Sequence, residues 1–195
     1  MNNTSTNLSK TIKISLLAAI SVILMFFEFP ILPLFPWLKI DMSELPVLMG
    51  AFAFGPIVGI IVEGLKIVLF FIVRGTQSFG VGEVANFIIG ISFVVPASII
   101  YNRNRNKKTA IIGMMVGTLF MEVFAIVANI YFLLPAYGMA MDSAQLMNYV
   151  VAGLLPFNGI KAVLVSIVTF VVYKRVSETI FKAEMKTRET KEISR

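Results

Sequence analysis

The composition of this 195-residue chain excludes an ordinary soluble domain. Hydrophobic residues make up 57% of it, charged residues only 14%, and the mean hydropathy is +0.86, which leaves too little polar surface for a water-soluble fold. The chain has neither cysteine nor histidine, which excludes disulfides, thiolate nucleophiles and sites built on histidine. The net charge of +6 comes from basic residues beside the apolar runs, which indicates contact with anionic lipid rather than with nucleic acid.

Five apolar runs predict helices that cross a membrane. They cover residues 12–29, 45–73, 84–101, 109–134 and 150–173. Basic residues mark the cytoplasmic side of a membrane protein, and here they gather near residues 10–13, 103–108 and 174–195. All three groups can face the cytoplasm only if an even number of crossings separates each pair.

The run at 45–73 is therefore expected to contain two crossings. Gly55 and Pro56 interrupt it, because proline cannot continue the hydrogen bonds of a helix and glycine permits a turn. The first of the two helices is short, roughly 15 to 22 Å long at about 1.5 Å per residue. The expected fold is an all-α integral membrane protein with six transmembrane helices and both termini in the cytoplasm. Residues 1–176 are expected to form one transmembrane domain, followed by a charged cytoplasmic tail or surface helix at 177–195.

Polar side chains are costly in hydrocarbon, so those inside the spans are candidates for function. Asn158 and Lys161 share one face of the last span, and Glu122 and Asn129 share one face of the span before it. Since these two helices run in opposite directions, all four groups are expected at a similar depth beneath the outer loops, where they would form a pocket. Two alternatives stay open: a structural role for Lys161, paired with Glu122 or snorkelling to the interface, and hydrogen bonds between helices for the asparagines.

Three further polar groups have simpler explanations. Glu63 and Lys66 lie three residues apart on one helix, which favours a structural ion pair. Glu83 near the start of the fourth span suits the helix dipole, and the pattern allows Asn86, one turn further on, to face the same outer pocket.

The chain lacks a recognisable nucleotide-binding loop. The nearest approach, GIIVEGLK at 59–66, has its lysine one place late and lies within an apolar run. The chain must therefore couple to an ion gradient, act passively or rely on other subunits for energy.

Five segments are distinctive in their order and spacing. They are FPWLKIDMSELP at 35–46, FAFGP at 52–56, VEGLK at 62–66, GEVANF at 82–87 and LPFNGIK at 155–161. Together they resemble the substrate-binding S components of bacterial energy-coupling factor (ECF) transporters, and within that family the riboflavin-specific members. The resemblance extends from residue 11 to about residue 173.

This resemblance implies a six-helix fold in which riboflavin enters from outside and is bound beneath the first outer loop. The substrate-binding residues that we expect from it, together with the pocket prediction, are Leu38, Lys39, Asp41, Asn86, Asn129, Asn158 and Lys161. Amide and ammonium donors suit the carbonyl and ring-nitrogen acceptors of the isoalloxazine ring, and apolar side chains suit its flat body. Trp37 would either stack on the ring or anchor the loop at the membrane interface.

The resemblance also implies partners. These are a transmembrane coupling (T) subunit and two ABC-type ATPase subunits in a bacterial cell membrane, with riboflavin as the transported substrate and neither a cofactor nor a catalytic residue. The family carries small residues spaced four apart on its first span, at the contact with the coupling subunit. Ser15 and Ala19 fit that spacing, whereas Val22 departs from it four places after Ala18, and small residues facing lipid are the alternative.

Two other functions remain open from the residues alone. The same fold could take a different vitamin, because few residues determine the pocket. A small ion-coupled carrier or an intramembrane enzyme could instead use Glu63, Glu122 and Lys161.

Overall fold

The apolar runs fold into helices, because a backbone in hydrocarbon must satisfy its own hydrogen bonds. The computed structural model describes residues 3–76 and 79–172. Its elements, in chain order, are α1 (Asn3–Phe26), β1 (Phe29–Pro30), β2 (Lys39–Ile40), α2 (Glu44–Phe54), α3 (Pro56–Arg74), α4 (Val81–Arg103), α5 (Lys107–Ala128), the π-helical η1 (Asn129–Leu133), α6 (Leu134–Ala136), α7 (Ser143–Asn148) and the π-helical η2 (Tyr149–Leu154). Residues 155–172 continue η2 as an α-helix, which we call the last helix. The tail expected at 177–195 lies outside the described residues.

The prediction of a helical membrane protein is confirmed. Within residues 3–76 and 79–172, five helical stretches are long and apolar enough to cross a membrane: Leu8–Phe26, Pro56–Arg74, Val81–Arg103, Lys107–Ala136 and Ser143–Val172. The helix α2 is also apolar but has only 11 residues. The break expected inside the run at 45–73 is present, since Gly55 has a φ of 100° and Pro56 is the first residue of α3.

The first helix is shorter at its C-terminal end than expected. The apolar run suggested a helix to residue 29, but α1 ends at Phe26. Phe29 precedes a proline, which favours an extended backbone. Phe29 and Pro30 pair antiparallel with Ile40 and Lys39, so this short ladder clamps the two ends of the loop that follows α1.

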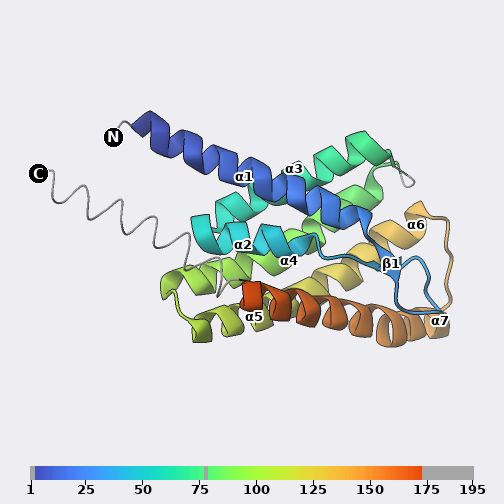
Figure 1. Cartoon of the computed structure of the whole chain (residues 1–195). Coiled ribbons are helices and arrows are strands. Elements are labelled where there is room, and N and C mark those ends of the chain that lie inside the picture. Colours follow the sequence, from blue (N-terminus) through green and yellow to red (C-terminus); the bar gives the residue numbers. More distant parts are fainter. Residues whose placement is uncertain (1–2, 77–78, 173–195) are drawn as a thin grey trace, which may run out of the picture.

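The connections gather at the two ends of the bundle (Figure 1). The α1–α2 loop (residues 27–43) and the α6–α7 connection (residues 137–142) lie at one end, which we call the loop end. The start of α1 and the α4–α5 turn lie at the other end. Arg103, Arg105, Lys107 and Lys108 lie at or beside that turn, so we call it the basic end.

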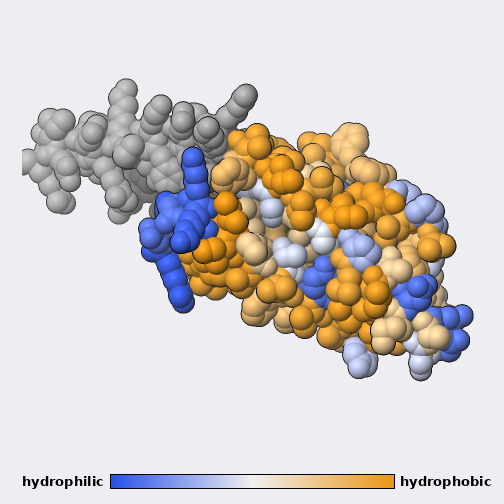
Figure 2. Space-filling view, turned by 90° about the horizontal axis from the view of Figure 1, so that it is seen from below, coloured by the Kyte–Doolittle hydropathy of each residue, from blue (hydrophilic) through white to orange (hydrophobic). Residues whose placement is uncertain are grey.

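Close packing in the interior depends on small residues. A methyl group at Gly113 would lie only 2.5 Å from the carbonyl oxygen of Ala97, so the absence of a side chain lets α4 and α5 approach. Outside, hydrophobic residues cover most of the face in Figure 2, and the largest groups of hydrophilic residues lie at its two ends. This distribution fits a bundle whose middle is surrounded by lipid.

Candidate functional site

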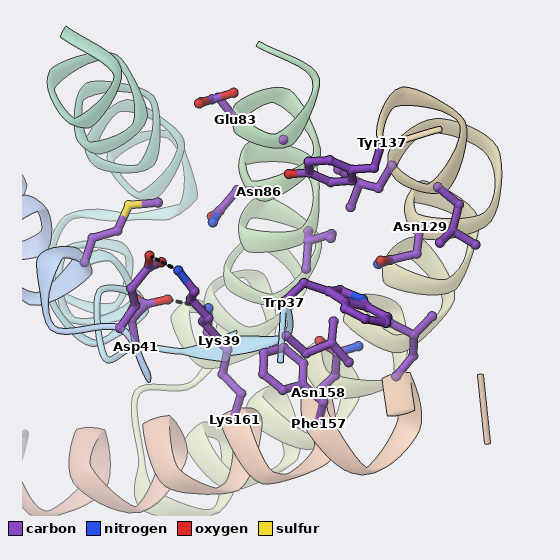
Figure 3. A pocket seen from close by; sticks show the side chains of 18 of the residues that line it. Trp37, Lys39, Asp41, Glu83, Asn86, Asn129, Tyr137, Phe157, Asn158 and Lys161 are labelled. Atoms are coloured by element: carbon purple, nitrogen blue, oxygen red, sulfur yellow. Dashed lines mark hydrogen bonds and ion pairs between the residues drawn. The ribbon is translucent and has the colours of Figure 1, made fainter. Parts of the chain in front are cut away.

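A cavity of about 350 Å³ lies at the loop end of the bundle, within the range of about 300 to 1,000 Å³ typical of small-molecule sites. All seven side chains that the sequence singled out for binding belong to its lining, and all of them except Leu38 are labelled in Figure 3. The seven are Leu38, Lys39, Asp41, Asn86, Asn129, Asn158 and Lys161. The fold therefore brings together groups from the α1–α2 loop, α4, η1 and the last helix.

The β1–β2 ladder positions the loop residues of the site. Lys39 belongs to β2, so its backbone is fixed by pairing with Pro30. On either side of it, Leu38 and Asp41 are buried, with 7% and 5% of their surface exposed. The backbone amide of Ser43 donates a hydrogen bond of 2.7 Å to Asp41 Oδ1, and this turn leads directly into α2.

Lys161 crosses from the last helix to this loop. Its Nζ lies 3.1 Å from Asp41 Oδ2 and 3.5 Å from Glu44 Oε1. The alternative of a structural pair between Lys161 and Glu122 is wrong, because Lys161 pairs with Asp41 of the loop and Glu44 of α2 instead. Burial alone would raise the pKa of Asp41, but the ammonium groups of Lys161 and Lys66 and the hydrogen bonds from Ser43 lower it below its ordinary value.

A second buried lysine, Lys66 on α3, contacts the same Glu44 carboxylate as Lys161. Lys66 Nζ is 2.7 Å from Glu63 Oε1 and 3.1 Å from Glu44 Oε1, and it also donates to Ser43 Oγ at 3.2 Å. Both Lys66 and Glu63 are fully buried. The predicted structural pair of Glu63 and Lys66 is confirmed, and Glu44 links it to Lys161.

Glu44 is a residue that the sequence reasoning missed. It contacts both lysines and lines the cavity. Its position in the first turn of α2 suggests an ordinary capping role, since a carboxylate is favourable at any helix N-terminus. Only the packing of α2 against α3 and the last helix reveals its central place.

Tyr149 is the second missed residue. Its hydroxyl donates to Asn129 Oδ1 at 2.7 Å and accepts from Trp37 Nε1 at 3.3 Å. Its ring packs edge-on against Phe35, with centroids 5.3 Å apart. A tyrosine at the edge of an apolar run is usually an interfacial residue, so its burial at 1% exposure could not be expected from its position in the chain.

Glu122 and Asn158 meet as the sequence suggested. Asn158 Nδ2 lies 3.5 Å from Glu122 Oε2, a long hydrogen bond across the two helices. Asn158 lines the cavity and is buried, with 4% of its surface exposed. Of the four polar groups expected to form one pocket, Asn129, Asn158 and Lys161 line the cavity, whereas Glu122 contacts Asn158 from outside that lining.

Three charged side chains of the cavity lining are partly exposed to solvent. Glu28 Oε1 lies 3.0 Å from Lys39 Nζ and 2.6 Å from Arg74 Nη1. These contacts link the end of α1, β2 and the end of α3. Exposed pairs of this kind contribute little to stability, so they position the rim rather than hold the fold.

Ser15 and Ala19 lie away from the cavity. Both are exposed on α1, whereas Ala18 and Val22 of the same helix are buried at 1% and 9% exposure. The small pair predicted to contact a partner is therefore on the outer face of the bundle.

The fold and the cavity together define a class: a helical membrane protein with a cavity of small-molecule size under a loop at one end of the bundle. The chain belongs to the family of substrate-specific components of ECF transporters, whose model matches residues 9–173. With five helices apolar enough to cross a membrane, it is a multi-pass protein of a bacterial cell membrane.

Several known proteins are similar over most of their length. The riboflavin transporter RibU of Staphylococcus aureus (strain TCH60) is 38% identical over 172 residues, covering 86% of this chain and 90% of that protein. The riboflavin transporter FmnP of Bacillus subtilis (strain 168) is 34% identical over 170 residues, covering 84% of this chain and 90% of that one. A solved structure of the S component of a bacterial ECF transporter matches with a TM-score of 0.77 at 37% identity, covering 89% of this chain and 98% of the other.

Proposed function

We propose that this chain is the riboflavin-binding S component of an ECF-type importer. The observation that carries the proposal is that seven side chains, selected from the sequence for flavin binding, line one cavity. The riboflavin transporters of S. aureus and B. subtilis are similar to this chain over more than four fifths of its length, which supports the same substrate.

The chemistry of the lining suits a flavin. Asn129, Asn158 and Lys161 offer amide and ammonium donors to the carbonyl oxygens and ring nitrogens of an isoalloxazine. Leu38, Met121 and Phe157 supply apolar surface in the same cavity, as the flat body of the ring requires. In this arrangement Asp41 and Lys39 belong to the cover formed by the α1–α2 loop, and Asn86 faces the ligand from α4.

The six crossings and the cytoplasmic termini are part of the proposal. The helix α2, about 16 Å long for its 11 residues, would be a short crossing in addition to the five longer ones. With six crossings, the loop end faces outside and the basic end faces the cytoplasm. The four basic residues at or beside the α4–α5 turn support this orientation. Residues 1–176 would then form one transmembrane domain, with 177–195 as a cytoplasmic extension.

Transport by this chain would need partners. Its sequence has no ATPase motif, so the energy would come from two ABC-type ATPase subunits through a transmembrane T subunit. The exposed Ser15 and Ala19 on α1 are suited to close helix contact with that T subunit. The role of this chain would be to bind riboflavin from outside and reorient, without catalysis and without a cofactor.

The test is a titration of riboflavin with detergent-purified protein, read as quenching of riboflavin fluorescence. We expect saturable quenching that neither thiamin nor biotin reverses. Folded, ligand-free protein that fails to quench would contradict a riboflavin site, and reversal by one competitor would assign the cavity to that vitamin.

A further inference from the structure

Three polar side chains form a chain of hydrogen bonds along the wall of the cavity. Trp37 from the α1–α2 loop, Tyr149 from η2 and Asn129 from η1 are joined through the tyrosine hydroxyl. Figure 3 shows Trp37 and Asn129 near one another on the cavity wall. These three residues come from segments up to 112 residues apart in the chain.

The direction of each hydrogen bond follows from the groups involved. An indole nitrogen can only donate, so the Tyr149 hydroxyl must accept from Trp37. Its single hydrogen is then free for Asn129, and the acceptor at 2.7 Å is the amide oxygen Oδ1. The amide nitrogen of Asn129 in turn donates to the carbonyl oxygen of Ala125 at 2.8 Å.

This sequence of bonds determines which way the Asn129 amide points. Its oxygen is engaged by Tyr149, and one of its two N–H hydrogens is engaged by Ala125. The donor left for a bound molecule is the second N–H, while Oδ1 keeps one further lone pair. A wall group held in this way recognises a hydrogen-bond acceptor on the ligand.

We infer that Tyr149 is a positioning residue that sets the donor orientation of Asn129 and holds Trp37 against the cavity wall. The inference rests on the proposed function for the identity of the ligand, whose isoalloxazine carbonyls and ring nitrogens are acceptors. Tyr149 is suited to this role because it is buried, with 1% exposure, and packs against both Phe35 and Trp37.

The experiment compares Tyr149→Phe with the parent and with Tyr131→Phe. Tyr131 is 70% exposed on the outside of η1, so Tyr131→Phe makes the same chemical change away from the cavity. Trp37 is the single tryptophan of the chain, so its fluorescence reports on the loop without a label. In ligand-free protein we expect acrylamide quenching of Trp37 to rise in Tyr149→Phe and to stay at the parent value in Tyr131→Phe.

The binding measurement is a double-mutant cycle with Asn129→Ala. Loss of one hydrogen bond that orients the amide should weaken riboflavin binding by about tenfold in Tyr149→Phe. In the Asn129→Ala background the same substitution should cause no further loss, because no amide remains to orient. Size-exclusion profiles identify any variant that does not fold.

The two measurements separate this inference from the proposed function. Unchanged Trp37 quenching in Tyr149→Phe, or equal losses of affinity in the two backgrounds, would overturn the role of Tyr149. A parent protein that does not bind riboflavin would contradict the proposed function alone, and the Trp37 quenching would still decide whether Tyr149 holds the loop.

Discussion

At the scale of residues, Lys161 connects the last helix to the α1–α2 loop and to α2. It reaches Asp41 in the α1–α2 loop and Glu44 at the start of α2 while facing the cavity from the last helix. Removing one member of a buried charged group leaves the others without compensation, at a cost of about 3 to 5 kcal/mol. The side chain therefore affects both the position of the loop and the chemistry of the site.

We expect Lys161→Ala to weaken riboflavin binding by at least tenfold, because a hydrogen bond from a charged group contributes about 1.5 to 3 kcal/mol. Membrane insertion should be retained, since removing a charge from a span favours insertion. Fluorescence titration of the purified variant measures the effect. Lys108→Ala, which removes an exposed charge at the basic end, is the control. Parent-like affinity in Lys161→Ala would show that Lys161 lies outside the binding contacts.

Gly90 determines how closely the buried carboxylates approach α4. A methyl group there would lie 2.8 Å from Glu63 Cδ and 3.2 Å from Glu44 Oε2. We expect Gly90→Ala to destabilise the protein by about 1 to 3 kcal/mol through overpacking, seen as a lower melting temperature in detergent. At Gly64 the nearest atom to an added methyl is Phe87 Cε2 at 3.7 Å, an ordinary contact. Gly64→Ala should therefore leave the melting temperature unchanged or raise it, and equal effects at the two sites would refute the packing argument.

At the scale of elements, two π-helical segments contribute to the same cavity. The segment η1 begins with Asn129 and η2 begins with Tyr149, and these two residues are hydrogen-bonded to each other. A π-helical turn changes the angular position of the residues that follow it and occurs often at functional sites. Both helices therefore combine a regular membrane-spanning part with a local irregularity at the site.

The outer face of α1, which carries the exposed Ser15 and Ala19, is the proposed contact with the T subunit. We expect Ala19→Leu to leave riboflavin affinity unchanged and to reduce uptake when the T and ATPase subunits are present, because a larger side chain prevents close helix contact. Val163→Leu enlarges a side chain that is 56% exposed on the last helix and serves as the control. Fluorescence titration measures the riboflavin affinity, and transport into proteoliposomes that contain all the subunits measures the uptake. Loss of affinity in Ala19→Leu would instead connect this face to the cavity.

At the scale of the whole molecule, the proposed orientation can be tested directly because the chain has no cysteine. Ala140→Cys introduces a thiol at the loop end and Lys108→Cys introduces one at the basic end, both at exposed positions. In intact cells we expect a membrane-impermeant maleimide to label the first and not the second. The opposite pattern would reverse the orientation, and labelling of both from outside would contradict six crossings.

Much of this protein could be predicted from particular residues. The helical membrane class follows from the length of the apolar runs, because hydrocarbon admits few other backbone structures. The break at Gly55 and Pro56 follows from their backbone chemistry, and the i, i+3 pair of Glu63 and Lys66 follows from helix geometry.

Asn129, Asn158 and Lys161 could be selected because a polar group is costly within a span unless it has a partner or a function. The loop residues Lys39 and Asp41 were instead expected from the resemblance to the S components.

The tertiary structure alone decided which of these groups meet. Lys161 pairs with Asp41 and not with Glu122, Glu44 joins the two lysines, and Tyr149 connects Trp37 to Asn129. The physical reason is that such pairings depend on where the α1–α2 loop folds over the bundle and on how the π-helical turns rotate the side chains that follow them. Local periodicity determines which side chains share a helix face, but contacts between segments more than 100 residues apart depend on packing that no single segment specifies.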